Sequence, residues 1–227
     1  MSCASSSYGN KSSYTNMSGN MKSKVRVVHN VANGPDVDGY LDGMKVLKNF
    51  GYKSISDYLE VKSGKHTLTV KVSSNDSVII NGDVNLMPGK AYTVIVHGLI
   101  SDLNSISSLV LEDNLMCPME GKAHVRFIHA AAGVPAVDIY AGNTKIFDNV
   151  AYGQVGNPMY LPVDAGMVDV SVTAAGSLDI ALGPINLRLV GRNIYTVIAS
   201  GLIGDDRSPL TALVTEDTKG SCIVMNM

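Results

Sequence analysis

The chain has 227 residues, 45% of them hydrophobic, and a formal net charge of −2 at pH 7. A charge this close to zero creates no extended positive field, which argues against a nucleic-acid partner. No run of roughly eighteen or more apolar residues occurs, which excludes an ordinary transmembrane helix. The first 24 residues contain no Val, Ile or Leu, so we expect no secretory signal.

The chain opens with a segment, residues 1–23, that is rich in Ser and Asn and contains no acidic residue. Such a composition cannot bury enough apolar surface to offset the entropy of ordering, so we predict a flexible N-terminal arm. The alternative is an arm that orders against a partner or a neighbouring copy. Its apolar anchors would then be Tyr8, Tyr14, Met17 and Met21.

Two similar modules follow the arm. The segment VRVVHNVANGPDVDGY at Val25–Tyr40 returns as VRFIHAAAGVPAVDIY at Val125–Tyr140, with half of its positions identical. A later block, YTVIVHGLI, returns as YTVIASGLI with only two changes. We predict a first module at residues 24–117 and a second at 118–227, each long enough to bury a core of its own.

Short strand patterns fill the first module. We predict strands at Lys24–His29, Val37–Leu41, Ile55–Val61, Lys65–Val72, Val78–Leu86, Ala91–Gly98 and Ser107–Glu112. The clearest of them places His66, Leu68, Val70 and Val72 on one face and polar residues on the other. No segment shows a sustained helical period. The pattern therefore predicts an all-β chain of two tandem immunoglobulin-like antiparallel β-sandwich domains.

Several of these motifs resemble the domain-of-unknown-function family 4397. They are the opening V-R-[VF]-[VI]-H, the following P-x-V-D-x-Y, the later Y-T-V-I and the junction PMEGKAHVRFIHA at Pro118–Ala130. The resemblance covers nearly all of residues 24–217 in two copies. It implies repeated β-sandwich modules, usually of exported or surface-attached bacterial proteins, with no established activity or catalytic residues.

The chain departs from the family pattern in two ways. Family members often begin VHASPDAPAVD, whereas His29 is followed here by NVANGPDVD, so the first loop differs in shape and polarity. The expected absence of an export signal is the second departure. The resemblance implies an extracellular or surface location, and a virion or another self-assembled particle would provide a surface without secretion.

Two pairs of ionisable residues recur at equivalent positions. His29 and Asp38 correspond to His129 and Asp138. We predict that each histidine bonds to its aspartate and braces the loop after the first strand. A pair of metal ligands, or a general base with an orienting carboxylate, is the alternative. Either role needs a third group, and none recurs with them.

Arg26 and Arg126 recur as well. We predict structural ion pairs with carboxylates near the ends of the modules, and anion binding is the alternative. The candidate partners are Glu112 or Asp113 and Glu216 or Asp217.

The three cysteines, Cys3, Cys117 and Cys222, include no CxxC spacing. They suit free thiols in a reducing compartment, or disulfides and an intermolecular link in an exposed assembly. The chain has no G-x-S-x-G, H-E-x-x-H or phosphate-loop motif, so we expect no enzyme, cofactor or metal site.

We therefore expect a non-enzymatic structural or assembly module of a surface or particle, with the N-terminal arm docking on a neighbouring subunit or another copy. The alternative is an adhesion or ligand-binding module that recognises carbohydrate or protein through the loops at the ends of the sandwiches. The absence of Trp and the presence of only three Phe favour assembly, because ligand-binding loops are typically rich in aromatic residues.

Overall fold

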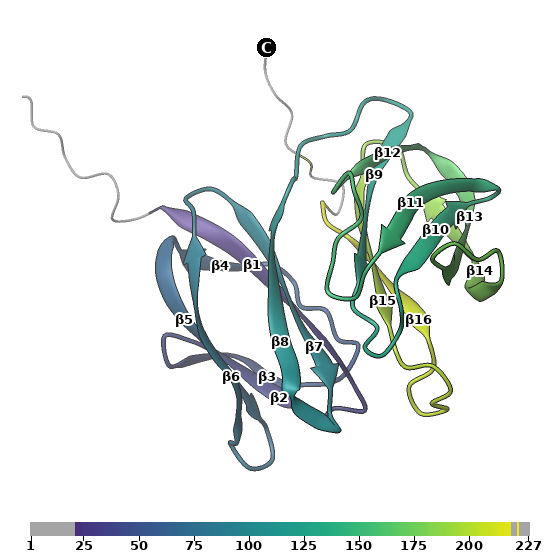
Figure 1. The fold of residues 1–227 in the computed structure, drawn as a ribbon. Helices are drawn as coiled ribbons and strands as arrows, with labels where there is room; N and C mark the ends of the chain where they lie inside the picture. Colours follow the sequence, from purple (N-terminus) through teal and green to yellow (C-terminus); the bar gives the residue numbers. More distant parts are fainter. Residues whose placement is uncertain (1–20, 219–221, 223–227) are drawn as a thin grey trace, which may run out of the picture.

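The computed structural model describes residues 21–218 and Cys222 (Figure 1). Within this part of the chain it contains sixteen strands and no helix, which confirms the all-β prediction. The strands of the first half are β1 (Lys22–Ala32), β2 (Val37–Leu41), β3 (Met44–Phe50), β4 (Leu59–Lys62), β5 (Gly64–Val72), β6 (Val78–Leu86), β7 (Ala91–Leu99) and β8 (Asp102–Asp113).

The second half repeats this order of strands. Its strands are β9 (Lys122–His129), β10 (Val137–Ala141), β11 (Thr144–Val150), β12 (Leu161–Asp164), β13 (Gly166–Ala174), β14 (Ile180–Leu189), β15 (Ile194–Ser200) and β16 (Thr211–Glu216). We call β1–β8 the first module and β9–β16 the second module.

Each module is a sandwich of two four-stranded sheets, as predicted. The first module has one sheet in the order β4-β1-β7-β8 and another in the order β3-β2-β5-β6. The second module has the matching sheets β12-β9-β15-β16 and β11-β10-β13-β14. The pairing is antiparallel except that β1 pairs in parallel with β7, and β9 with β15. The predicted antiparallel β-sandwich is confirmed as a fold class, but these two parallel pairs were not expected, because alternation does not encode strand direction.

Two strand assignments also differ from the prediction. β3 was missed because its polar and apolar residues do not alternate regularly and five of its seven residues are exposed, as is usual for an edge strand. The strand predicted at Ile55–Val61 is shorter than expected. It pairs only over Leu59–Lys62, and Ile55 contributes an isolated bridge to Val28.

The four sheets form four layers, because the modules meet through one sheet of each (Figure 1). Side chains alternate between the two faces along the strands of these inner sheets, so one face packs inside its own sandwich and the other packs against the opposite module. In β9, Val125 and Phe127 face the core of the second sandwich, whereas Ile128 belongs to a separate core between the modules. That third core also contains Val28 from β1. Both faces of each inner sheet are therefore buried, while the outer sheets have one free face.

Candidate functional site

The recurring arginines lie at the interface between the modules. Arg26 in β1 precedes Val28 by two residues, and Arg126 in β9 precedes Ile128 by two, so both arginines share the face that meets the other module. Their side chains are 2% and 0% exposed. Buried guanidinium groups require acceptors, and the surroundings of these two supply them.

Each arginine pairs with the carboxylate that ends the opposite module. Arg26 Nη2 donates to Asp217 Oδ1 at 2.6 Å, and Arg126 Nη2 donates to Asp113 Oδ1 at 2.6 Å. Both carboxylates are fully buried. The sequence identified Asp113 and Asp217 among its candidates, and the structure shows that the pairs cross between modules.

Two threonines close these pairs into a ring. Thr93 Oγ1 accepts from Arg26 Nε at 2.9 Å and donates to Asp113 at 2.8 Å. Thr196 Oγ1 accepts from Arg126 Nε at 3.1 Å and donates to Asp217 at 2.7 Å. The hydrogen bonds therefore form a closed circuit through six buried side chains. We call this circuit the interface ring: Arg26, Thr93, Asp113, Arg126, Thr196 and Asp217.

A tyrosine ring covers each guanidinium group. The Arg26 Cζ atom lies 5.0 Å from the centre of the Tyr58 ring, and Arg126 Cζ lies 4.9 Å from that of Tyr160. The Tyr58 hydroxyl donates to Asp113 at 2.8 Å. Burial raises the pKa of this hydroxyl, and the Asp113 carboxylate raises it further, so Tyr58 stays neutral. Burial likewise raises the pKa of Tyr160.

The two halves of the ring differ at the Nη1 atoms of the arginines. Arg26 Nη1 donates to Thr215 Oγ1 at 3.0 Å. The equivalent position in the first module is Leu111, which has no acceptor in its side chain. Among the described residues, Arg126 Nη1 is accordingly buried without a hydrogen-bond partner. The Nη2 atom of Arg126 instead makes additional contacts, with Thr93 at 3.3 Å and Thr196 at 2.9 Å.

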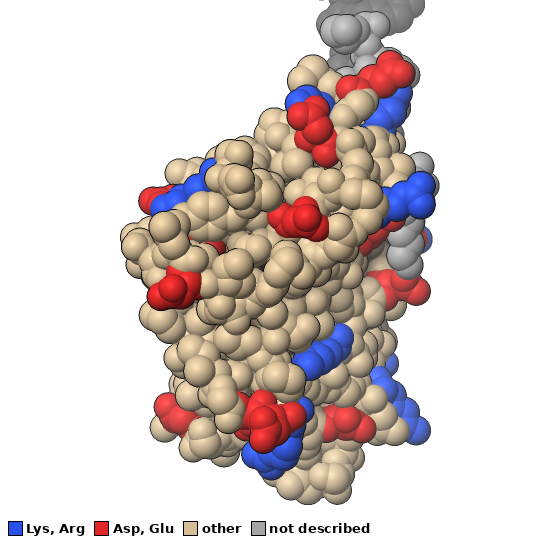
Figure 2. Space-filling model, turned by 90° about the vertical axis from the view of Figure 1, so that its right-hand side faces the viewer, with Lys and Arg blue, Asp and Glu red and all other residues tan. Residues whose placement is uncertain are grey.

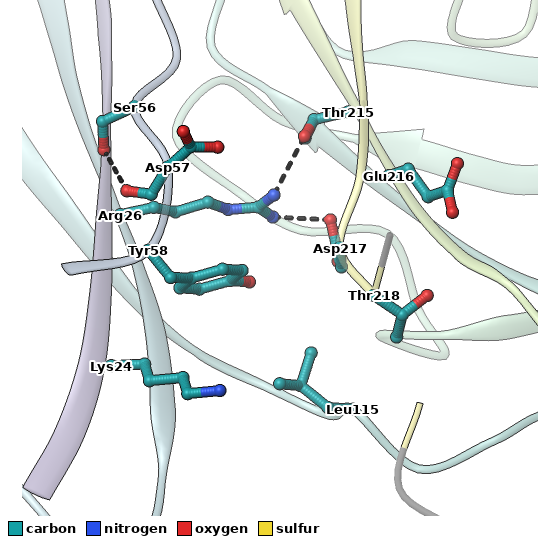
Figure 3. A pocket seen from close by; sticks show the side chains of 10 residues that line it. All are labelled: Lys24, Arg26, Ser56, Asp57, Tyr58, Leu115, Thr215, Glu216, Asp217 and Thr218. Carbon is teal, nitrogen blue, oxygen red and sulfur yellow. Dashed lines mark hydrogen bonds and ion pairs between the residues drawn. The ribbon is translucent and has the colours of Figure 1, made fainter. Parts of the chain in front are cut away.

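A cleft of about 270 Å³ opens beside Arg26, between the two modules (Figure 3). Lys24 and Tyr58 line it from the first module, and Glu216 and Thr218 line it from the second. The nitrogens of Arg26 already donate to Thr93, Thr215 and Asp217, so the guanidinium group has little capacity left for an anion. The lining residues contain neither His nor Cys.

The predicted bond between His29 and Asp38 does not form. His29 Nε2 donates to the Pro35 carbonyl at 2.9 Å, and Asp38 instead accepts from Lys45, Ser73 and the Asn49 N–H. The reason is that His29 belongs to an inner sheet, whereas Asp38 lies in β2 of the outer sheet, beside β3 and β5. The histidine alone braces the loop.

The second module repeats this arrangement. His129 Nε2 donates to the Pro135 carbonyl at 2.9 Å, and Asp138 pairs with Lys145 at 2.7 Å. Burial lowers the pKa of both His29 and His129, which favours neutral imidazoles. Within residues 21–218 and Cys222, no group of three or more His, Cys, Asp or Glu side chains could hold a metal ion.

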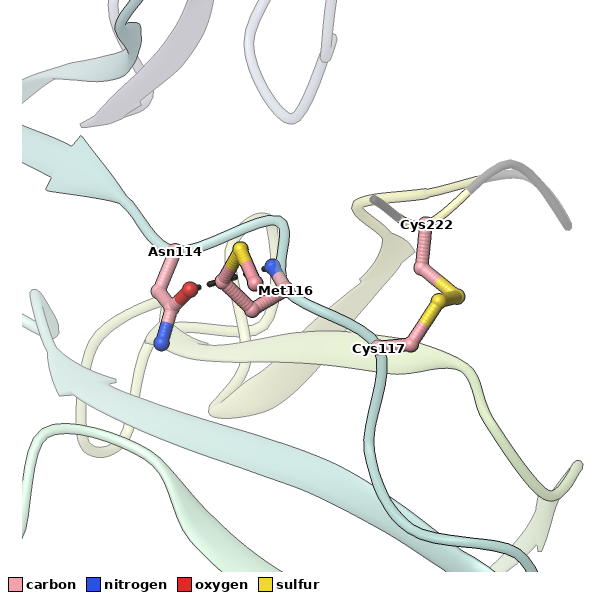
Figure 4. The surroundings of a disulfide bond; sticks show 4 residues. All are labelled: Asn114, Met116, Cys117 and Cys222. Carbon is pink, nitrogen blue, oxygen red and sulfur yellow. Dashed lines mark hydrogen bonds between the residues drawn. A yellow bond between two sulfur atoms is a disulfide. The ribbon is translucent and has the colours of Figure 1, made fainter. Parts of the chain in front are cut away.

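A disulfide joins Cys117 to Cys222, with a Cα–Cα distance of 4.8 Å (Figure 4). These two residues are therefore not the free thiols expected for a reducing compartment. Cys117 lies in the segment between β8 and β9, where Asn114 Oδ1 accepts from the Met116 N–H and shapes a turn just before it. The covalent loop spans a sequence separation of 105 and encloses the second module.

The remaining candidates concern the N-terminal arm. Cys3, Tyr8, Tyr14 and Met17 lie outside the described residues. Met21 is described and is 48% exposed at the entrance to β1, where its carbonyl accepts from the Ser63 N–H. Docking of the arm therefore stays a prediction. The described part of the chain has no helix long and apolar enough to cross a membrane.

Comparisons with known proteins gave one family match. The model of the family described as "Domain of unknown function (DUF4397)" matches residues 23–140 and 123–222. A search of curated proteins found no match. Among solved structures, the crystal structure of CBMbc (family CBM26) from Eubacterium rectale Amy13K in complex with maltoheptaose is 12% identical, with a TM-score of 0.26. The match covers 89% of this chain and 100% of that chain, but a likeness this distant says nothing about what this chain binds.

We predict that Asp113→Asn destabilises the protein by about 3–5 kcal/mol, because it removes the carboxylate closest to the buried, charged Arg126. Urea unfolding at pH 7 measures the change. Glu60→Gln is the matched control, since it removes an ion pair with Lys22 whose two side chains are mostly exposed, and it should leave stability almost unchanged. Equal effects of the two substitutions would contradict the assigned role of the ring.

Loss of the disulfide should also be costly. We predict that Cys222→Ser lowers the free energy of unfolding by about 3–5 kcal/mol, because opening a loop of this length frees the unfolded chain. Reductant should lower the urea midpoint of the unchanged protein to that of the variant. Cys3→Ser is the control and should keep the full response to reductant. A midpoint that reductant does not move would show that this bond is absent in solution.

Proposed function

The chain belongs to the DUF4397 family, and we propose that its two modules act together as one non-enzymatic structural unit of a surface or particle. In this proposal the inner sheets hold the unit together, and the outer sheets and the N-terminal arm meet neighbouring subunits. The interface ring is the observation that carries the proposal. It uses the arginines, threonines and aspartates that recur in both copies.

The use of these residues favours a structural role over catalysis. A catalytic group must reach its substrate with a free donor, acceptor or nucleophilic atom. In the interface ring, the arginines and carboxylates neutralise one another, and the threonine hydroxyls are engaged as both donors and acceptors. Both recurring histidines are bonded to backbone carbonyls. The ring residues and the two histidines therefore all act to fix the positions of strands and loops.

Recognition through the loops at the sandwich ends is the second candidate, and the positions of the loop tyrosines do not favour it. Tyr52 and Tyr152 follow β3 and β11, where an exposed aromatic ring could serve ligand capture. Instead, the Tyr52 hydroxyl lies 3.1 Å from Ser200 Oγ, and the Tyr152 hydroxyl lies 2.7 Å from His97 Nδ1. Both contacts join opposite modules, so these side chains support the interface.

Exposed apolar side chains on the outer parts of the molecule support contacts with neighbours. Met44, Met119 and Met167 are each more than half exposed, at 69%, 73% and 63%. Methionine adapts its shape easily and is common at binding surfaces. Residues 1–20 lead directly into β1, so the proposed arm would leave the fold from an inner sheet.

The proposal predicts self-association that depends on the arm. The full chain should form oligomers whose proportion rises with concentration in sedimentation velocity, and a chain that begins at Met21 should not. The full chain carrying Tyr8→Ser, Tyr14→Ser and Met17→Ser should behave like the shortened one. A full chain that is strictly monomeric at its highest soluble concentration, with and without reductant, would contradict assembly from copies of this chain.

A further inference from the structure

The free face of the outer sheet β11-β10-β13-β14 carries a shallow groove of about 210 Å³. Tyr140 and Asn143 line it from β10 and the turn after it, and Ser171 and Thr173 from β13. Leu178 and Ile180 line it from the β13–β14 hairpin and are 84% and 56% exposed. The side of the molecule on which β13 and β14 lie has a broad uncharged area between scattered charges (Figure 2).

The lining of the groove is neutral and amphipathic. It offers one aromatic ring, one amide and three hydroxyl groups, that of Tyr140 included, beside two aliphatic side chains. Lys145, which lies over the Tyr140 ring, is paired at 2.7 Å with the buried Asp138 carboxylate. A charged ligand would find no free counterion in this lining, whereas a neutral ligand with many hydroxyl groups would find donors and acceptors.

One of the hydroxyl groups lacks a partner. Thr173 is 3% exposed, and among the described residues its Oγ1 atom has no hydrogen-bond partner. A buried hydroxyl without a partner destabilises the fold, and a ligand that pairs with it would remove that cost. At the equivalent position, opposite the buried aspartate of the neighbouring strand, the first module has Lys71. In the second module Asp138 accepts from the Gly176 N–H at 3.0 Å and from Lys145, and not from Thr173.

The cations that surround the tyrosine ring also differ between the two modules. Lys45 and Lys71 both lie over the Tyr40 ring of the first module, with Nζ atoms 5.4 and 4.9 Å from its centre. The Tyr140 ring has one such contact, to Lys145 at 5.8 Å. Thr173 stands where the first module has Lys71, so a small hydroxyl replaces a cation that lies over the ring in the first module.

We propose that this groove binds one neutral sugar ring of a glycan. The Tyr140 ring offers an apolar face to the C–H groups of the sugar, while Asn143, Ser171 and Thr173 meet its hydroxyl groups. The volume is below the roughly 300–1,000 Å³ of pockets that hold drug-sized ligands, which limits the groove to a single ring. The site goes beyond the proposed assembly role, because it lies on a strand face away from the module interface.

Titration of the full chain with glucose, galactose, mannose and N-acetylglucosamine, followed by saturation-transfer NMR, tests the proposal. At least one of these sugars should bind. Tyr140→Ala should weaken that binding about tenfold, as expected for loss of an aromatic contact. Tyr40→Ala is the matched control from the first module and should leave the affinity unchanged.

Two further variants test the groove in case Tyr140→Ala fails to fold. Asn143 is exposed in a turn, so Asn143→Ala removes a groove donor without touching the core. Thr173→Val keeps the shape of the side chain and removes its hydroxyl. Each should weaken sugar binding several-fold. Absence of binding by all four sugars at tens of millimolar (~10⁻² M, the weak end of measurable affinity) would overturn the proposal. So would an affinity that Tyr40→Ala lowers as much as Tyr140→Ala, or that Tyr140→Ala leaves unchanged.

Discussion

Two buried arginines and two buried carboxylates impose the strongest constraint on this molecule. A guanidinium group removed from water is tolerable only if an anion and further acceptors meet it in fixed geometry. Arg26 finds its anion in Asp217, which is 191 residues away in sequence and belongs to the other module, and Arg126 finds Asp113 in the same way. Thr93 and Thr196 then connect each arginine to the aspartate of its own module. A module separated from its partner would leave a charged arginine and a charged aspartate uncovered on an apolar sheet face.

The same constraint determines which surfaces remain available. The interface occupies one face of each inner sheet. It also engages the side chains of four tyrosines, Tyr52, Tyr58, Tyr152 and Tyr160. Ion pairs of this kind add less stability than an apolar core of equal volume, but an unpaired member is heavily penalised, so the ring mainly enforces one relative position of the modules. The disulfide from Cys117 to Cys222 reinforces that position, because it ties the end of the second module to the segment between the modules. The outer sheets keep one free face each, and on these faces the two copies differ, for example at Lys71 and Thr173.

Sequence patterns predicted local structure better than long-range pairing. Alternation in Lys65–Val72 located β5, with Leu68 and Val70 buried as expected, because a half-buried strand has a period of two. β3 has no such alternation and was missed. The repeat identified the arginines and aspartates of the interface ring, but the two copies carry the same motif, so the sequence cannot say which copy supplies each partner. Thr93 and Thr196 also recur, within Y-T-V-I. Because threonine is common in strands, the sequence did not indicate that their hydroxyl groups take part in the interface ring. The His29–Asp38 bond was wrong because nine residues of separation do not reveal that the two strands belong to different sheets.

The central claim is that the interface ring makes the two modules one cooperative unit. Differential scanning calorimetry of the full chain under oxidising conditions tests it most directly, because it compares the measured enthalpy of unfolding with the van 't Hoff enthalpy of the transition. The interface described above predicts a single transition in which the two enthalpies agree for the whole chain. Two separate transitions, or a van 't Hoff enthalpy near half of the calorimetric value, would show that the modules unfold independently and would contradict the claim.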